Sequence, residues 1–160
     1  MRSKGLTLGL LLALVAAIGI FAVAAAAQKP MSGSISLVGG PAADCEGGME
    51  IWATGDGTLA HIGKVTIVST NCTGRDNNKG PTGLWDGKAT FETADGATIE
   101  ATFEGSQKAP VGTIAEYTTT MTITGGTGRL KGATGAWTIA GTIDFSTGKL
   151  VGDVSGWLRT

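Results

Sequence analysis

The chain has little of the chemistry that most enzyme and metal sites need. Its 160 residues include one histidine, two cysteines and four prolines, and only 16% of them are charged. One histidine and two cysteines make a poor zinc site, so we expect neither a metal nor a cofactor. The sequence has no cluster of basic residues beyond its first few positions, which argues against nucleic acid as a partner.

The one long uncharged stretch lies at the N-terminus. Arg2 and Lys4 precede an apolar run over residues 6–27, and Ala25 and Ala27 suit a small-x-small cleavage site. This pattern predicts a helical secretory signal peptide over residues 1–27, and a secreted or periplasmic protein. The alternative is an uncleaved anchor, because an apolar run of about 20 residues is long enough to span a bilayer. Only in that case do we expect a membrane as a partner.

The exported part is one domain. Cleavage after Ala27 would leave 133 residues, 28–160, which is enough for a single hydrophobic core. Loss of the two basic residues of the leader would change the net charge from −1 to −3. Cys45 and Cys72 both lie in this part, and an isolated pair in an oxidising compartment predicts one disulfide.

In the exported part, apolar and polar residues alternate with period two, and glycine and threonine are frequent. This pattern and composition favour strands and tight turns. Most of the expected connections are short hairpins in sequence order. The prediction is an all-β fold, a single antiparallel up-and-down barrel of about eight strands, rather than a sandwich. The eight expected strands cover residues 32–38, 49–54, 64–71, 87–93, 97–105, 114–124, 135–145 and 149–158.

Two hairpins have apolar faces that predict their register. A three-residue loop over 94–96 pairs Phe91 with Ile99, so that apolar side chains share one face. Such a loop needs a left-handed residue at its end, which is a glycine here, and we expect a G1 bulge. In the last hairpin, an even-length loop around 147–148 would pair Phe145 with Leu150 and, further along, Trp137 with Leu158.

The stretch GGTGRLKGATG (125–135) joins two of these strands. Glycine-rich runs with basic residues often cradle phosphates, but this one matches neither the P-loop nor the dinucleotide pattern, and no helix follows it. We therefore predict a tight corner, or one short helical turn, with its arginine held by a carboxylate or by backbone carbonyls. The residues expected to build this structural turn are Gly125, Gly126, Gly128, Arg129, Gly132 and Gly135.

The same motif, followed by AWTIAGTIDF (136–145), resembles the end of allene oxide cyclase-like barrels, and dirigent proteins carry a comparable stretch. LAHIGKVTI (59–67) and ATFETADGATI (89–99) resemble segments of secreted bacterial members of this group. The resemblance implies an eight-stranded barrel. It carries over no catalytic residue, because the matching positions are turns and barrel walls.

The apolar faces and the lone histidine supply candidates for a pocket inside the barrel, although a barrel can also be filled solidly by such side chains. The favoured function is binding of a small apolar or aromatic molecule without catalysis, because neither paired carboxylates nor a nucleophile triad is recognisable. The alternatives are a cyclase or coupling-directing enzyme of the same fold, and an extracellular interaction module. The sequence leaves the oligomeric state open. The pocket candidates are Trp52, His61, Phe91, Phe103, Tyr117, Met121 and Trp137.

Overall fold

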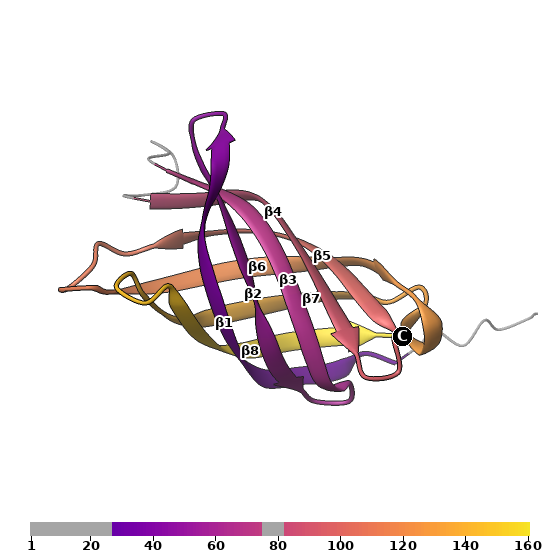
Figure 1. Cartoon of the computed structure of the whole chain (residues 1–160). Coiled ribbons are helices and arrows are strands. Elements are labelled where there is room, and N and C mark those ends of the chain that lie inside the picture. Colours follow the sequence, from indigo (N-terminus) through magenta and orange to yellow (C-terminus); the bar gives the residue numbers. More distant parts are fainter. Residues whose placement is uncertain (1–26, 75–81) are drawn as a thin grey trace, which may run out of the picture.

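The protein is a closed barrel of eight antiparallel strands (Figure 1). The computed structural model describes residues 27–74 and 82–160. Neighbouring strands follow the sequence order, and the last strand pairs with the first. The expected up-and-down barrel is thereby confirmed, while the expected signal helix lies outside the described residues. Within the described ranges, no helix has the length and apolar character needed to cross a membrane.

Each predicted strand is present, and the first runs well beyond its predicted range of 32–38. A single short 3-10 turn, η1, interrupts the connection between the sixth and seventh strands. The elements are β1 (Lys29–Cys45), β2 (Gly48–Leu59), β3 (Gly63–Gly74), β4 (Thr82–Thr93), β5 (Thr98–Gln107), β6 (Ile114–Gly126), η1 (Gly128–Leu130), β7 (Thr134–Asp144) and β8 (Lys149–Arg159).

Apolar side chains fill the end of the barrel that holds the β2–β3, β4–β5 and β6–β7 connections, which we call the closed end. Its centre is an edge-to-face pair, Phe91 and Trp137, with ring centroids 5.2 Å apart and both residues 1% exposed. The indole nitrogen of Trp137 donates a hydrogen bond to the carbonyl of Trp157 at 3.1 Å. Leu59 and Ile99 belong to the same cluster of buried residues, so this end is filled by an apolar core.

The β6–β7 connection folds across the closed end, at the right of Figure 1. Leu130 of η1 is buried in the core, whereas Arg129 reaches outward to two other connections. Its guanidinium donates one hydrogen bond to the carbonyl of Ile62 in the β2–β3 turn at 2.9 Å. It donates another to the carboxylate of Asp95 in the β4–β5 turn at 3.0 Å. The segment is therefore a corner that ties three connections together.

Glycine is required at two positions of this corner, because Gly128 and Gly132 have φ angles of 55° and 75°. The other expected turn glycines lie within strands. Gly125 and Gly126 end β6, and Gly135 belongs to β7.

Replacing Arg129 with alanine is expected to lower the melting temperature by about 4 °C. The carbonyl of Ile62 loses its donor, and one hydrogen bond of this kind contributes about 1 kcal/mol, which corresponds to a few degrees in a domain of this size. Thermal melts followed by circular dichroism measure the difference. The control is Lys131→Ala, which removes an exposed cation from the same segment and should leave the melting temperature unchanged.

The decrease in melting temperature caused by Arg129→Ala should also depend on pH. The pKa of the Asp95 carboxyl is lowered, first by a hydrogen bond from the Thr93 hydroxyl and then by Arg129. A carboxyl with a depressed pKa stabilises the folded state above its unfolded-state pKa and loses that contribution as the pH falls through the folded value. The difference in melting temperature between wild type and Arg129→Ala should therefore narrow as the pH falls below the ordinary pKa of an aspartate, about 3.9. A difference that stays constant in acid would show that the Arg129–Asp95 pair does not contribute.

The β4–β5 hairpin has the predicted register, with Phe91 opposite Ile99. Gly96 has a φ of 77° and donates its N–H to the carbonyl of Thr93, while the N–H of Thr93 donates to the carbonyl of Ala97. These bonds define the expected three-residue loop with a G1 bulge.

The predicted register of the β7–β8 hairpin is wrong by two residues. Ile143, not Phe145, pairs with Leu150, and Trp137 faces Gly156 instead of Leu158. The cause is Asp144, whose carboxylate accepts hydrogen bonds from the backbone N–H and the hydroxyl of Ser146 at 2.9 and 2.7 Å. A short polar side chain that bonds the backbone two residues on starts a turn at its own position. Phe145 therefore leaves the sheet, and its side chain is 51% exposed.

Candidate ligand-binding site

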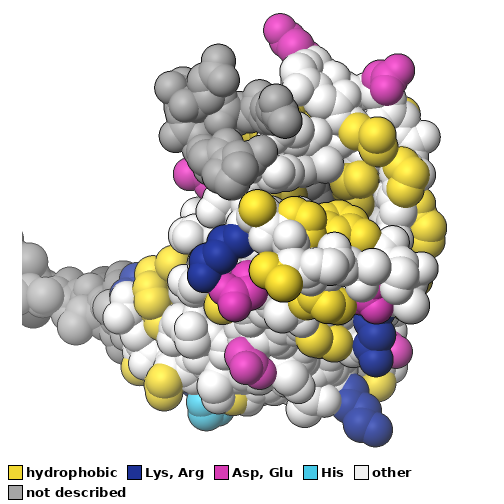
Figure 2. All heavy atoms as spheres, turned by 90° about the vertical axis from the view of Figure 1, so that its left-hand side faces the viewer, with side chains coloured by type: hydrophobic (Ala, Val, Ile, Leu, Met, Phe, Trp, Pro, Cys, Tyr) yellow, Lys and Arg dark blue, Asp and Glu magenta, His cyan; other side chains and the backbone are white. Residues whose placement is uncertain are grey.

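The other end of the barrel holds an open cavity of about 360 Å³. We call it the luminal cavity. Its volume lies at the lower end of the range for small-molecule sites, roughly 300–1,000 Å³. Figure 2 looks into this end and shows apolar side chains gathered around a hollow, with charged side chains of both signs around it. Most of the wall is apolar, and the side chains that form it include Leu37, Ile51, Phe103, Met121, Ile139 and Leu150.

Alternation along the strands delivers these side chains to the cavity. On β6, Tyr117, Thr119 and Met121 are buried, whereas the residues between them are exposed. The inward row continues toward the closed end with Ile123, which belongs to the solid core. Position along the strand therefore decides whether an inward residue lines the cavity or fills the core.

The cavity wall carries polar groups but no charge among the described residues. Ser69 on β3 and Thr119 on β6 are buried there, 9% and 5% exposed. The Tyr117 hydroxyl is directed into the wall and donates a long hydrogen bond to the carbonyl of Val151 at 3.4 Å. Burial raises the pKa of Tyr117 to about 12, so the phenol stays neutral at physiological pH. The interior is thus an uncharged surface with a few hydrogen-bonding points.

Three of the seven pocket candidates line the luminal cavity, namely Phe103, Tyr117 and Met121. Phe91 and Trp137 also point inward, but they lie in the core of the closed end.

The remaining two candidates lie outside the lumen. Trp52 is on the outer face of β2 and is 42% exposed, because its neighbours Ile51 and Ala53 take the inward positions. His61 is exposed in the β2–β3 turn at the closed end, with a left-handed φ of 63°. A histidine at that end of the barrel does not reach the cavity.

Several residues that line the cavity were not among the pocket candidates predicted from the sequence, which were mainly aromatic side chains and a methionine. Ser69 follows Val65 and Ile67 in the inward row of β3, and Thr119 stands between Tyr117 and Met121 in that of β6. Period-two counting places both hydroxyls inside the barrel. That signal was available in the sequence, but a polar residue in an apolar row is easily assigned to the surface.

The predicted disulfide is present at the mouth of the barrel. Cys45 at the end of β1 is bonded to Cys72 on β3, with their Cα atoms 6.2 Å apart. Trp85 packs beside it, within reach of any side chain placed at Gly48 or Gly74. The link ties the β1–β2 hairpin to β3, next to cavity residues Ile51 and Asn71, and so holds the rim of the cavity in shape.

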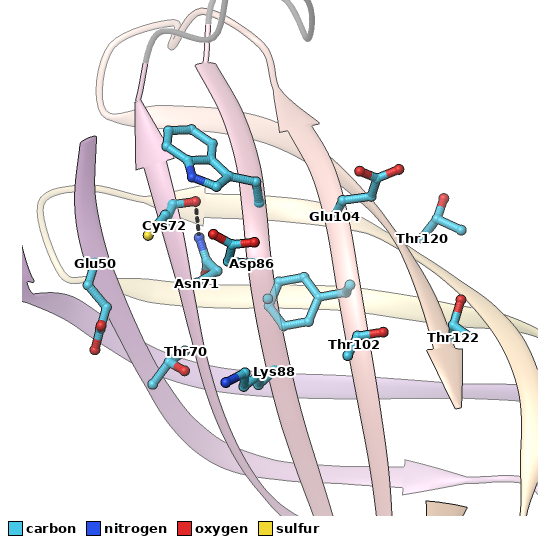
Figure 3. A pocket seen from close by; sticks show the side chains of 13 residues that line it. Glu50, Thr70, Asn71, Cys72, Asp86, Lys88, Thr102, Glu104, Thr120 and Thr122 are labelled. Carbon is cyan, nitrogen blue, oxygen red and sulfur yellow. Dashed lines mark hydrogen bonds between the residues drawn. The ribbon is translucent and has the colours of Figure 1, made fainter. Parts of the chain in front are cut away.

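A second, shallow hollow lies on the outer face of the barrel, across β2 to β6 (Figure 3). Its charged side chains are Glu50, Asp86, Lys88 and Glu104, set among threonines. In Figure 3 the side chain of Asn71 donates to the carbonyl of Cys72, at 3.0 Å. The described residues form no group of three or more metal-binding side chains, there or elsewhere. Asn71 and Phe103 line the luminal cavity as well, but the charged side chains make this hollow polar, in contrast to the apolar lumen.

Comparison with solved structures finds a similar fold in the pterocarpan synthase dirigent protein GePTS1. The TM-score is 0.54 and the sequence identity 15%, over 83% of this chain and 86% of that one. At this identity the likeness shows the fold alone, which is a dirigent-like eight-stranded barrel. No family model matches the chain, and a search of curated proteins finds no match.

Proposed function

We propose that the protein binds a small, uncharged, largely apolar molecule in the luminal cavity and does not chemically transform it. The observation that carries the proposal is the division of the barrel into a solid closed end and an open end with an apolar cavity of about 360 Å³. Transfer of an apolar molecule from water into such a space is favourable, because its surface and that of the wall leave water together.

The chemistry of the wall favours binding over catalysis. General acid–base catalysis needs a group that exchanges protons near neutral pH, and nucleophilic catalysis needs an activated side chain. Among the described cavity residues only Tyr117 is ionisable, and its pKa of about 12 keeps it protonated. The similar dirigent barrel is named as a synthase, and that name supports the enzyme alternative only through the fold.

A neutral fluorescent probe tests the proposal directly. N-phenyl-1-naphthylamine should bind the wild-type protein in the micromolar range with a rise in emission. Ala53→Phe places a ring in the cavity and should weaken binding at least tenfold. Ala140→Phe makes the same change on the exposed outer face of β7 and should leave binding unchanged. Absence of binding to the wild type, or equal binding to both variants, would refute the proposal.

We also propose that the protein is exported and processed, as in the secreted bacterial barrels that its motifs resemble. The disulfide supports an extracellular or periplasmic location, because such bonds persist in oxidising compartments. Intact-mass measurement of the protein from its source tests this. A mature chain that begins at Gln28 is expected, and a mass that includes residues 1–27 would favour the anchored alternative.

A further inference from the structure

Two hydroxyl-bearing residues of the luminal cavity, Ser69 and Thr119, make no side-chain hydrogen bond within the described part of the chain. They are 9% and 5% exposed. Thr93 shows the usual arrangement, since it is equally buried and its hydroxyl donates to the carbonyl of Ala97 at 2.9 Å. Neither hydroxyl oxygen is among the fully enclosed polar atoms of the described residues, so both remain accessible to a molecule in the cavity.

Of the other polar side chains that line the cavity, Thr82 and Gln107 are only partly buried, and the remaining three form hydrogen bonds. The Tyr117 hydroxyl donates to the Val151 carbonyl, and the Asn71 amide donates to the Cys72 carbonyl. Ser69 and Thr119 stand on β3 and β6, strands separated by two others in the barrel order, and both line the cavity. Both side chains therefore border the space that a ligand would occupy, from two different parts of the wall.

We infer that Ser69 and Thr119 are the hydrogen-bonding residues of the site and that they select a neutral ligand with a carbonyl, ether or hydroxyl oxygen on an apolar body. This inference rests on the proposed binding function. A hydroxyl both donates and accepts, so each residue can pair with such an oxygen. A carboxylate is disfavoured, because the described cavity wall offers no cation to offset the loss of its hydration.

Three probes of equal size test separately the need for an oxygen atom and the exclusion of a negative charge. They are 2-acetylnaphthalene, 2-isopropenylnaphthalene and 2-naphthoate. The ketone and the alkene differ only in an oxygen against a methylene group, and the third replaces the ketone by an anion. Calorimetric titration of the wild type should show the ketone bound about tenfold more tightly than the alkene, as expected for one or two good hydrogen bonds. The carboxylate should bind more weakly than either.

The double variant Ser69→Ala/Thr119→Val removes both hydroxyls with little change in shape. It should bind the alkene at least as tightly as the wild type and lose the preference for the ketone. The matched control, Ser36→Ala/Thr118→Val, makes the same changes at exposed positions on β1 and β6 and should keep that preference.

Failure of the inference and failure of the proposed function give different results. If the wild type binds the alkene and the ketone equally, or the double variant keeps the preference, the role of the two hydroxyls is overturned while the cavity remains a binding site. Tighter binding of the carboxylate than of the ketone would overturn the selection for neutral ligands. If the wild type binds neither the ketone nor the alkene, the proposed function fails as well.

Discussion

Replacing Trp137 with alanine is expected to lower the free energy of unfolding by about 4 kcal/mol, the usual cost of removing a large buried ring. Trp137 is 1% exposed, packs edge-to-face on Phe91 and satisfies the Trp157 carbonyl. The variant loses all three contributions and leaves a cavity in the closed end. Urea denaturation followed by circular dichroism measures the change, which should appear as a lower midpoint with an unchanged slope.

Two further variants make the Trp137 experiment decisive. Trp137→Phe keeps a ring beside Phe91 but gives up the hydrogen bond and part of the volume, so it should cost about half as much and remain folded. Trp52→Ala removes the same side chain from the outer face, where it is 42% exposed, and should cost less than about 1 kcal/mol. Equal losses at positions 52 and 137 would contradict the assignment of Trp137 to a solid core.

The buried core at the closed end stabilises the barrel, and the open end contains the luminal cavity. Phe91 and Phe103 illustrate the division, since both lie in inward rows of adjacent strands, β4 and β5. Phe91 lies opposite Ile99 beside the β4–β5 turn and is 1% exposed. Phe103 lies opposite Gly87, further from that turn, and lines the luminal cavity. An inward phenylalanine therefore belongs either to the core or to the cavity wall, depending on its position along the barrel axis.

The sequence did not reveal the position of each inward side chain along the barrel axis. Alternation with period two predicts the face of a strand on which a side chain lies, and it placed Phe91, Phe103 and Met121 inside the barrel. It does not predict how far along the barrel axis a residue lies, which depends on the stagger between strands. For this reason the pocket candidates included Phe91 and Trp137, although both belong to the core.

The two hairpin registers show where local chemistry overrides the apolar pattern. The β4–β5 loop was predictable because Gly96 occupies the one position that needs a left-handed conformation. In the β7–β8 loop the apolar pattern favoured Phe145 as a strand residue. The hydrogen bonds of Ser146 to the Asp144 carboxylate end the strand earlier, and the aromatic side chain becomes part of the mouth.

Removal of the disulfide is expected to cost about 3 kcal/mol of stability. The bond closes a loop with a sequence separation of 27, and its loss enlarges the conformational freedom of the unfolded chain. Cys45→Ala/Cys72→Ala is the suitable pair of substitutions, because alanine places no new polar group at the buried position of Cys72. The midpoint of urea unfolding should fall, and wild-type protein kept in reductant should show the same fall.

The location of the disulfide leads to a second expectation for the same variant. The bond joins the β1–β2 hairpin to β3 at the mouth, whereas Trp137 lies in the closed end, so the two variants should affect binding differently. Below the unfolding transition, the Cys45→Ala/Cys72→Ala protein should bind N-phenyl-1-naphthylamine more weakly than Trp137→Phe does, because Ile51 and Asn71 at the rim lose their restraint. Equal affinities would show that the disulfide stabilises the barrel without shaping the cavity.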